Sequence, residues 1–207
     1  MKELDLLKKA WKKDNTSFEQ LSEGTLYSMI HKRSSSIVKW ILIISILEFI
    51  VLRGSDLLVL LDEKYKKEMN LAHLYGFEVV ITIINFIVLT VFIALFYKNF
   101  KVINTGSSTK KLMKDILNTR KIVKYYVWYN LLLVAFSSTI AVYFEIKNNS
   151  RVSLLYSKHE SLFIVVGIAI IAISILLFWL FYKLLYGILL NKLNTNYKEL
   201  SKIELEE

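Results

Sequence analysis

The strongest indication of the fold class is the stretch of residues 162–190, LFIVVGIAIIAISILLFWLFYKLLYGILL. Lys183 is its only charged residue, and the apolar letters do not alternate with polar ones. A helix needs about 20 mostly apolar residues to cross the hydrocarbon core of a bilayer, whereas strands are much shorter. The stretch therefore predicts a membrane-spanning helix.

Three other apolar blocks share this character, at residues 37–52, 72–97 and 125–144. Hydrophobic letters make up 55% of the 207 residues, although Lys and Arg still number 27. Soluble domains are about 45–50% apolar. Apolar and charged residues must therefore be segregated along the chain. This pattern predicts an all-α integral membrane protein, a bundle of four transmembrane helices.

Two residue types are missing from the sequence. Cys is absent, which excludes disulfides, Cys-ligated zinc, iron–sulfur clusters and a thiol nucleophile. Pro is absent as well. Since broken helices are typical of transporter binding sites, the lack of Pro predicts continuous helices and disfavours a transporter.

Lys and Arg residues concentrate in particular segments outside the blocks. Residues 1–36 carry seven and residues 97–124 carry eight against one acid, whereas the four in 53–71 are balanced by four acids. Because cytoplasmic loops are enriched in Lys and Arg, both termini and the middle segment are predicted to be cytoplasmic, in a bacterial inner membrane. An interfacial aromatic belt is expected from Trp40, Tyr97, Tyr125, Trp128, Tyr129, Trp179 and Tyr182.

Short matches recur 85 residues apart. IVKW at 37–40 corresponds to IVKY at 122–125, and FYK at 96–98 recurs at 181–183. Such a repeat predicts two duplicated helical hairpins related by an axis along the membrane normal. The predicted organisation is a cytoplasmic amphipathic segment 1–36, a first hairpin 37–98, a basic cytoplasmic loop 99–121, a second hairpin 122–190 and a cytoplasmic tail 191–207.

The repeat leaves two positions for the end of the first span, Leu52 or the neighbourhood of Val59. The longer span places Glu48 near the bilayer midplane. It also places Arg53 and Asp56 in the outer third, at an i,i+3 spacing that lets the two charges neutralise each other.

Three polar residues are expected inside the spans: Glu48, Asn85 and Asn130. An intramembrane carboxyl is a functional hypothesis by default, here ion or proton handling. The alternative is structural, with a protonated Glu48 hydrogen-bonded to Ser45, Asn85 or Asn130. Hydrogen bonds between helices account for the two Asn residues without a function.

A cluster of cations follows Gly106 in the middle segment, where no phosphate-binding glycine motif is present. Its members are Lys110, Lys111, Lys114, Arg120, Lys121 and Lys124. Basic juxtamembrane clusters attract anionic lipid headgroups, which is the predicted role. No nucleic-acid partner is expected, because no recognition fold surrounds the cluster.

Two histidines, His73 and His159, are expected at the outer membrane face, close to Glu78 and Glu160. Imidazole and carboxylate groups from both hairpins can in principle hold a divalent cation. The interpretation we favour is two interfacial imidazoles with no ligand. No catalytic residue and no cofactor are predicted.

Residues 1–13 are predicted to form an amphipathic helix with Leu4, Leu7 and Trp11 on one face. It either binds a cytoplasmic protein or lies on anionic lipid. The leading hypothesis is a non-enzymatic inner-membrane regulator or scaffold, a homo-oligomer that binds a cytoplasmic protein through residues 1–33. The alternatives are a small channel or proton-linked transporter that uses Glu48, and a membrane enzyme with an outer metal site.

The start of the chain carries a resemblance to a known family. The segments MKELDLLKKAWKK at 1–13, FEQLS at 18–22 and YSMIHKRSSSIVKW at 27–40 resemble the first residues of small four-span membrane proteins from Bacteroidetes-type bacteria. The resemblance implies a four-span fold and no established activity. Some relatives carry the label beta-carotene 15,15′-monooxygenase, which three His residues in total do not support.

Overall fold

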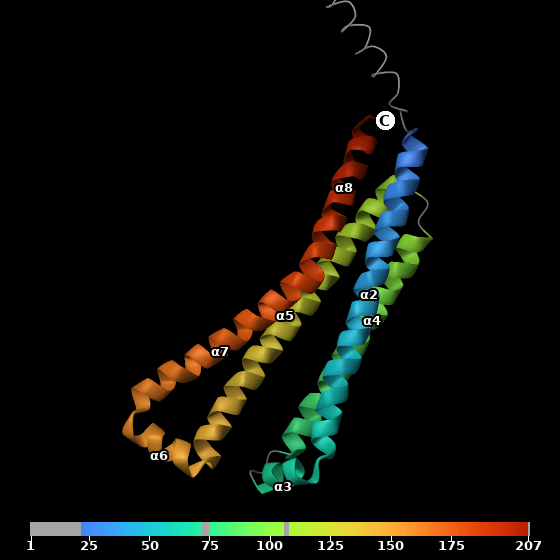
Figure 1. Ribbon diagram of the computed structural model, residues 1–207. Helices are drawn as coiled ribbons and strands as arrows, with labels where there is room; N and C mark the ends of the chain where they lie inside the picture. Colours follow the sequence, from blue (N-terminus) through green and yellow to red (C-terminus); the bar gives the residue numbers. More distant parts are fainter. Residues whose placement is uncertain (1–21, 72–74, 106–107, 207) are drawn as a thin grey trace, which may run out of the picture.

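The computed structural model describes residues 22–71, 75–105 and 108–206, and all of its regular elements are helices. Figure 1 shows them as two long hairpins. In chain order they are α2 (Glu23–Leu61), α3 (Glu63–Leu71), α4 (Tyr75–Asn104), α5 (Thr109–Asn148), α6 (Ser150–Lys158), α7 (Glu160–Tyr182), the π-helical turn η1 (Lys183–Gly187) and α8 (Ile188–Glu206). The expectation of an all-α fold is confirmed for these residues.

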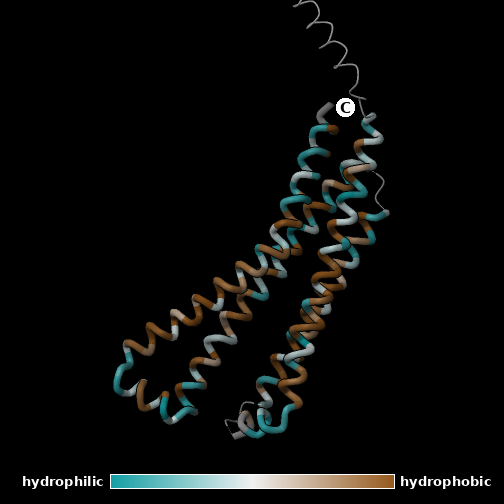
Figure 2. Tube along the Cα trace, in the orientation of Figure 1, coloured by the Kyte–Doolittle hydropathy of each residue, from teal (hydrophilic) through white to brown (hydrophobic). Residues whose placement is uncertain are grey.

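Four helical stretches are long and apolar enough to cross a membrane: Glu23–Leu61, Tyr75–Asn104, Thr109–Lys147 and Glu160–Glu204. Figure 2 shows the corresponding hydrophobic colouring along α4 and α7, and polar colouring at the chain turns and along much of α8. The four predicted apolar blocks each lie within one of these helices, apart from the start of the second block, which precedes α4.

Short polar side chains cap the first turns of α2, α5 and α6. The Ser22 hydroxyl accepts a hydrogen bond from the backbone N–H of Thr25 at 3.3 Å, and the Ser108 hydroxyl accepts one from Lys111 at 3.4 Å. These bonds satisfy donors that the first turn of a helix leaves free. Asn149 caps α6 in the same way, through Arg151 N–H at 3.1 Å. The helices α2, α5 and α6 therefore each begin directly after a short polar residue.

Several predicted segments prove more helical than expected. Residues 23–36 belong to the same helix as the first apolar block, because α2 runs without a break past Leu52 to Leu61. The basic segment 99–121 is mostly helix, since α4 continues to Asn104 and α5 begins at Thr109. The tail is helical through Glu206. Residues 1–21, including the predicted amphipathic helix, lie outside the described residues.

The prediction of continuous helices is confirmed for the described spans, although the fourth long helix, Glu160–Glu204, contains a local irregularity. There the π-helical turn Lys183–Gly187 separates α7 from α8, although no Pro is present. A π-helical turn adds one residue to a helical turn and often marks a functional position. Here it lies where the fourth helix joins the common core.

The core occupies the half of the molecule that contains the C-terminus. We call this part the terminal half, and the part that contains α3 and α6 the loop half. In the terminal half, α2, α4, α5 and α8 pack around one cluster of buried side chains. The fully buried members include Val38, Ile41, Phe96, Ile103, Leu112, Ile116, Val123, Leu193 and Leu200.

The two hairpins diverge toward the loop half, as Figure 1 shows. Here α7 packs along α5, and the only buried residues of α7 are Gly167 and Tyr182. A Cβ atom on Gly167 would lie 3.4 Å from Cγ1 of Val142. This glycine therefore allows close approach of α5 and α7 within the second hairpin.

Candidate functional site

A buried carboxylate and two tyrosines join the hairpins at the point where they diverge. Glu48 on α2 is only 8% exposed. Its Oε1 accepts a hydrogen bond from the Tyr182 hydroxyl at 2.5 Å, and its Oε2 accepts one from the Tyr186 hydroxyl at 2.9 Å. Both carboxylate oxygens are therefore satisfied by the fourth helix, which a buried acid requires.

The π-helical turn helps to position these donors. Tyr182 is the last residue of α7, and Tyr186 lies within the turn, four residues later. The ring of Tyr126 on α5 meets both tyrosine rings edge-on, with centroid distances of 6.3 and 5.7 Å. The rings of Phe92 and Phe96 of α4 also meet the Tyr126 ring edge-on, at centroid distances of 5.4 and 5.5 Å. The other three long helices thus contribute aromatic rings around Glu48 of α2.

The predicted partners of Glu48 are wrong. The Ser45 hydroxyl donates to the Leu42 carbonyl of its own helix at 2.8 Å, and Nδ2 of Asn130 donates to the Tyr126 carbonyl at 2.8 Å. Asn85 instead accepts a hydrogen bond from the Tyr129 hydroxyl. The three predicted partners are therefore occupied elsewhere, while the fourth helix supplies the donors.

The same observation corrects one member of the predicted aromatic belt. Tyr182 is buried inside the bundle, whereas Trp40, Tyr97, Tyr125 and Trp128 are exposed as a belt requires. The i,i+4 spacing of Tyr182 and Tyr186 near the end of the fourth block was the available signal. It places both hydroxyls on one side of a helix, yet it does not say which acid they face.

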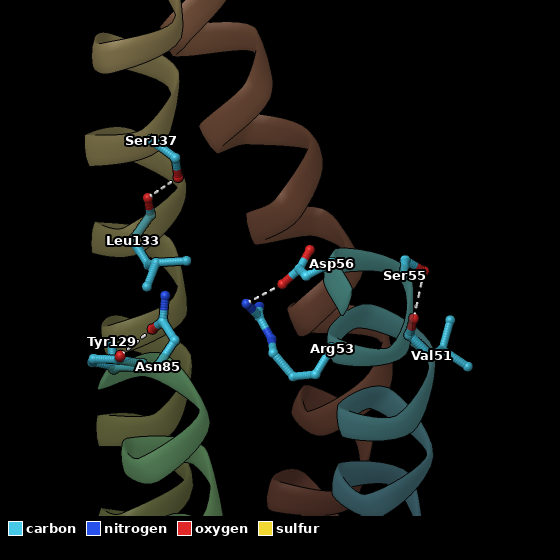
Figure 3. A network of polar contacts seen from close by, with 8 residues as sticks. All are labelled: Val51, Arg53, Ser55, Asp56, Asn85, Tyr129, Leu133 and Ser137. Atoms are coloured by element: carbon cyan, nitrogen blue, oxygen red, sulfur yellow. Dashed lines mark hydrogen bonds and ion pairs between the residues drawn. The ribbon is translucent and has the colours of Figure 1, made fainter. Parts of the chain in front are cut away.

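The predicted Arg53–Asp56 ion pair is confirmed. Nη1 of Arg53 lies 2.6 Å from Oδ2 of Asp56, and the Arg53 side chain is 11% exposed. Nε of Arg53 is buried and has no hydrogen-bond partner among the described residues. Figure 3 shows both side chains extending from α2 toward the side where Asn85 and Tyr129 lie. Polar groups thus continue from Glu48 a short way into the loop half.

The predicted basic cluster is divided by the geometry of α5. Lys110, Lys111 and Lys114 lie on the first turns of the helix, whereas Arg120, Lys121 and Lys124 lie about two to four turns further along. Nζ of Lys110 lies 3.3 Å from Oε1 of Glu204 on α8. Nζ of Lys121 lies 5.7 Å from the centroid of the Tyr125 ring. The six cations therefore form two groups rather than one.

Between these two groups, Asp115 has an incomplete set of partners. Its Oδ2 atom is buried without a hydrogen-bond partner among the described residues. Burial raises the pKa of this carboxyl, while Lys111 and Lys114 act in the opposite direction. Nearby, Nδ2 of Asn118 donates to Oδ1 of Asn99 at 3.1 Å and so connects α5 to α4.

The structure does not test the alternative of an outer metal site at His73 and His159. His73 lies outside the described residues, and His159 is exposed at the junction of α6 and α7. Among the described residues, no group of three His, Asp or Glu side chains is close enough to hold a metal ion. His31 has another role: its Nε2 lies 2.7 Å from the carbonyl oxygen of Ile103 at the end of α4.

These features define the class of protein: an all-α chain with four helices long and apolar enough to cross a membrane, joined at a buried Glu–Tyr–Tyr contact. Residues 24–205 match the family described as Domain of unknown function (DUF8845), and the chain belongs to that family. No curated protein and no solved structure matches it. The family agrees with the expectation of relatives whose activity is not established.

Proposed function

We propose that the protein is a multi-pass protein of the bacterial inner membrane, with both termini in the cytoplasm, that acts as a non-enzymatic regulator or scaffold. The terminal half carries this proposal. Beyond the apolar blocks, α2, α5 and α8 each continue for about 20 Å at 1.5 Å per residue. The core of the terminal half continues between these extensions, where Ile30, Leu112, Leu200 and Ile203 are buried.

Such an extension suits a protein that presents a folded surface to the cytoplasm. Polar bonds fix its helices: Nδ2 of Asn196 on α8 donates to the Ser34 hydroxyl on α2 at 2.9 Å, and both residues are buried. Segment 1–21 is joined to this packed unit at Ser22. The packed tyrosines around Glu48 also favour a structural role over a water-filled path.

The proposal includes a duplication of the two hairpins, and the burial pattern supports it. Each hairpin has a first helix of 39 or 40 residues followed by a helix of 9 residues. Four pairs of residues 85 positions apart are buried on both first helices, each at most 4% exposed: Ser34 and Thr119, Val38 and Val123, Ile41 and Tyr126, and Ser45 and Asn130. This match supports a pseudo-twofold axis along the membrane normal.

Single cysteines test the proposed orientation, because the natural chain has none. In spheroplasts, a membrane-impermeant maleimide is expected to label Ser157→Cys in α6 directly. It should label Ser108→Cys only after the membrane is permeabilised. The opposite labelling pattern contradicts the proposed orientation.

Deletion of residues 1–21 tests the regulator. This boundary keeps the Ser22 cap and the packed residues of α2, including Ile30 and His31. In-cell crosslinking followed by affinity purification is expected to lose specific cytoplasmic proteins upon deletion. The full-length chain with Lys198→Gln on α8 serves as a control. An unchanged set of crosslinked proteins contradicts binding through the N-terminal segment.

A small channel or proton-linked transporter is the second candidate, and the Glu48 contact is the observation that favours it. Acids inside a membrane commonly handle protons or ions, and Arg53 and Asp56 extend the polar groups beyond Glu48. In liposomes, this function predicts a proton or cation flux that Glu48→Gln abolishes. Equal flux in both proteins contradicts it.

A further inference from the structure

One exposed face of α5 carries cations around an apolar residue. With 100° per residue, Lys110, Lys114, Leu117, Lys121 and Lys124 fall on one face of the helix, and all five are exposed. We call this face the α5 ridge. Leu117 at its centre is 44% exposed. The opposite face of α5 is buried in the core of the terminal half.

Only the lower part of the ridge is near enough to a membrane to bind lipid. The exposed Tyr125 and Trp128 mark the interfacial level on α5. Lys114 lies about 16 Å and Lys110 about 22 Å beyond Tyr125 along the helix. The headgroup layer is only about 5–7 Å thick, and charges are screened within about 8 Å at physiological salt. Lipid therefore accounts for Lys121 and Lys124 but not for Lys110 and Lys114.

Among the described residues, only two acids face the upper cations. Lys110 and Lys114 are four residues apart, and like charges at this spacing destabilise a helix. Asp115 faces Lys111 and Lys114 from the same helix, and Glu204 of α8 pairs with Lys110. The Lys110–Glu204 contact shows the chemistry that this surface accepts, a carboxylate presented by a neighbouring helix.

We propose that the upper end of the α5 ridge, with Lys110, Lys114 and Leu117, forms a docking surface for an acidic amphipathic helix of a cytoplasmic protein. Lys111, also exposed, borders this surface about 60° around the helix from Lys114. Carboxylates of the partner helix pair with the three lysines, and an apolar side chain of the partner covers Leu117. Leu117 distinguishes this partner from a nucleic acid, since phosphate contacts need cations but no exposed leucine. The proposal rests on the proposed regulator function, and it supplies the chemistry of the partner.

A designed peptide tests this surface in the full-length protein. The protein is placed in phosphatidylcholine nanodiscs, so that no anionic lipid competes. The probe is a dye-labelled 18-residue helix of Glu and Leu, with the Leu residues on one face, and its Kd is measured by fluorescence anisotropy. The triple variant Lys110→Gln, Lys111→Gln, Lys114→Gln is expected to raise Kd at least tenfold, and Leu117→Ser about threefold.

The control variant removes the same number of positive charges from another face of the terminal half. Lys192→Gln, Lys198→Gln and Lys202→Gln replace three exposed lysines of α8 and should leave Kd within about twofold. Circular dichroism verifies that both triple variants remain folded. Equal losses in the two variants, or no loss in the first, overturn the proposal.

Two further probes separate the partner classes. Polyglutamate without Leu and oligouridine should each bind at least tenfold more weakly than the Glu–Leu helix. If either binds equally well, the ridge is a general polyanion site and the proposal is overturned. Failure of the regulator function is distinguishable, because deletion of residues 1–21 should leave peptide binding unchanged. Labelling of Ser108→Cys from outside the cell contradicts the regulator function without affecting the peptide assay.

Discussion

The terminal half and the loop half of the molecule contain the same helices but pack them differently. Along α2 the buried residues end at Glu48, and along α5 they end at Leu131. Along α4 they begin only at Asn85. From these levels toward α3 and α6, each hairpin packs mainly on itself, and Figure 1 shows the two hairpins diverging.

Hydrogen bonds follow the same division. In the terminal half they connect the hairpins, as in Asn196–Ser34 and the contacts of Glu48. At the far end of the loop half they remain within one hairpin, as in Tyr65–Glu78, where the hydroxyl donates to Oε1 at 2.5 Å, and in Tyr156–Glu160. Polar contacts between helices thus fix the relative position of the hairpins in one half only.

In our proposal, this difference follows from the surroundings of each part of the molecule, which are lipid in one part and water in the other. Lipid tails are as apolar as Leu, so an exposed apolar helix face in a membrane carries no penalty. The extension of the terminal half faces water in our proposal, and there the hydrophobic effect requires a closed core. The structural contrast is therefore the one expected if the bilayer surrounds the middle of the bundle and the long helices of the loop half, with α3 and α6 at its outer surface.

The largest expected effect compares one phenylalanine from each half. Phe96 in the terminal half is 0% exposed, and Phe136 in α5 beyond Leu131 is 53% exposed. Phe96→Ala leaves a cavity and should cost about 3–5 kcal/mol of unfolding free energy. Phe136→Ala should change it by at most about 0.5 kcal/mol. Unfolding by denaturing detergent measures both. Similar losses would contradict the division of the molecule into two halves.

The next effect concerns the contact that ends the common core. Replacing both Tyr182 and Tyr186 by Phe leaves the Glu48 carboxylate buried without its two donors. Each lost donor should cost about 1–3 kcal/mol, and the same unfolding measurement applies. The exposed Tyr143→Phe serves as the control. If the double variant is as stable as the natural protein, Glu48 does not hold the hairpins together.

The sequence predicted the helices of both halves, but it did not predict how these helices pack. Four apolar blocks without Pro were enough to predict the helices, since block length and composition are local properties. The Arg53–Asp56 pair was predictable for the same reason, because an i,i+3 spacing fixes the proximity of the two side chains. The divergence of the hairpins was not predictable, because it depends on contacts between distant segments.

The partners of Glu48 show the same limit. The sequence identified the acid, but Tyr182 and Tyr186 are 134 and 138 residues away, and their arrangement depends on a π-helical turn that no Pro or break signal marks. The spread of the basic cluster along α5 was not predictable for another reason. A segment interpreted as a loop keeps its charges together, whereas the actual helix spreads Lys110 and Lys124 about 21 Å apart.

The smallest expected effect concerns the partly buried carboxyl of Asp115 in the terminal half. Burial raises the pKa of Asp115 in the folded protein, so ionisation of this carboxyl disfavours folding. The cost is absent below the unfolded pKa of about 3.9. It grows as pH rises toward the folded pKa and is constant above it. Asp115→Asn removes the cost and should therefore stabilise the protein at neutral pH.

The stabilisation should be at most about 1 kcal/mol, because Asp115 is partly exposed and solvent screens its charge. Thermal unfolding at pH 3, 5 and 7 measures it, with Glu63→Gln on α3 as the matched change in the loop half. The difference between Asp115→Asn and the natural protein should be near zero at pH 3 and largest at pH 7. The opposite trend would mean that Lys111 and Lys114 outweigh burial, and that the terminal half uses this acid as a stabilising ion-pair partner.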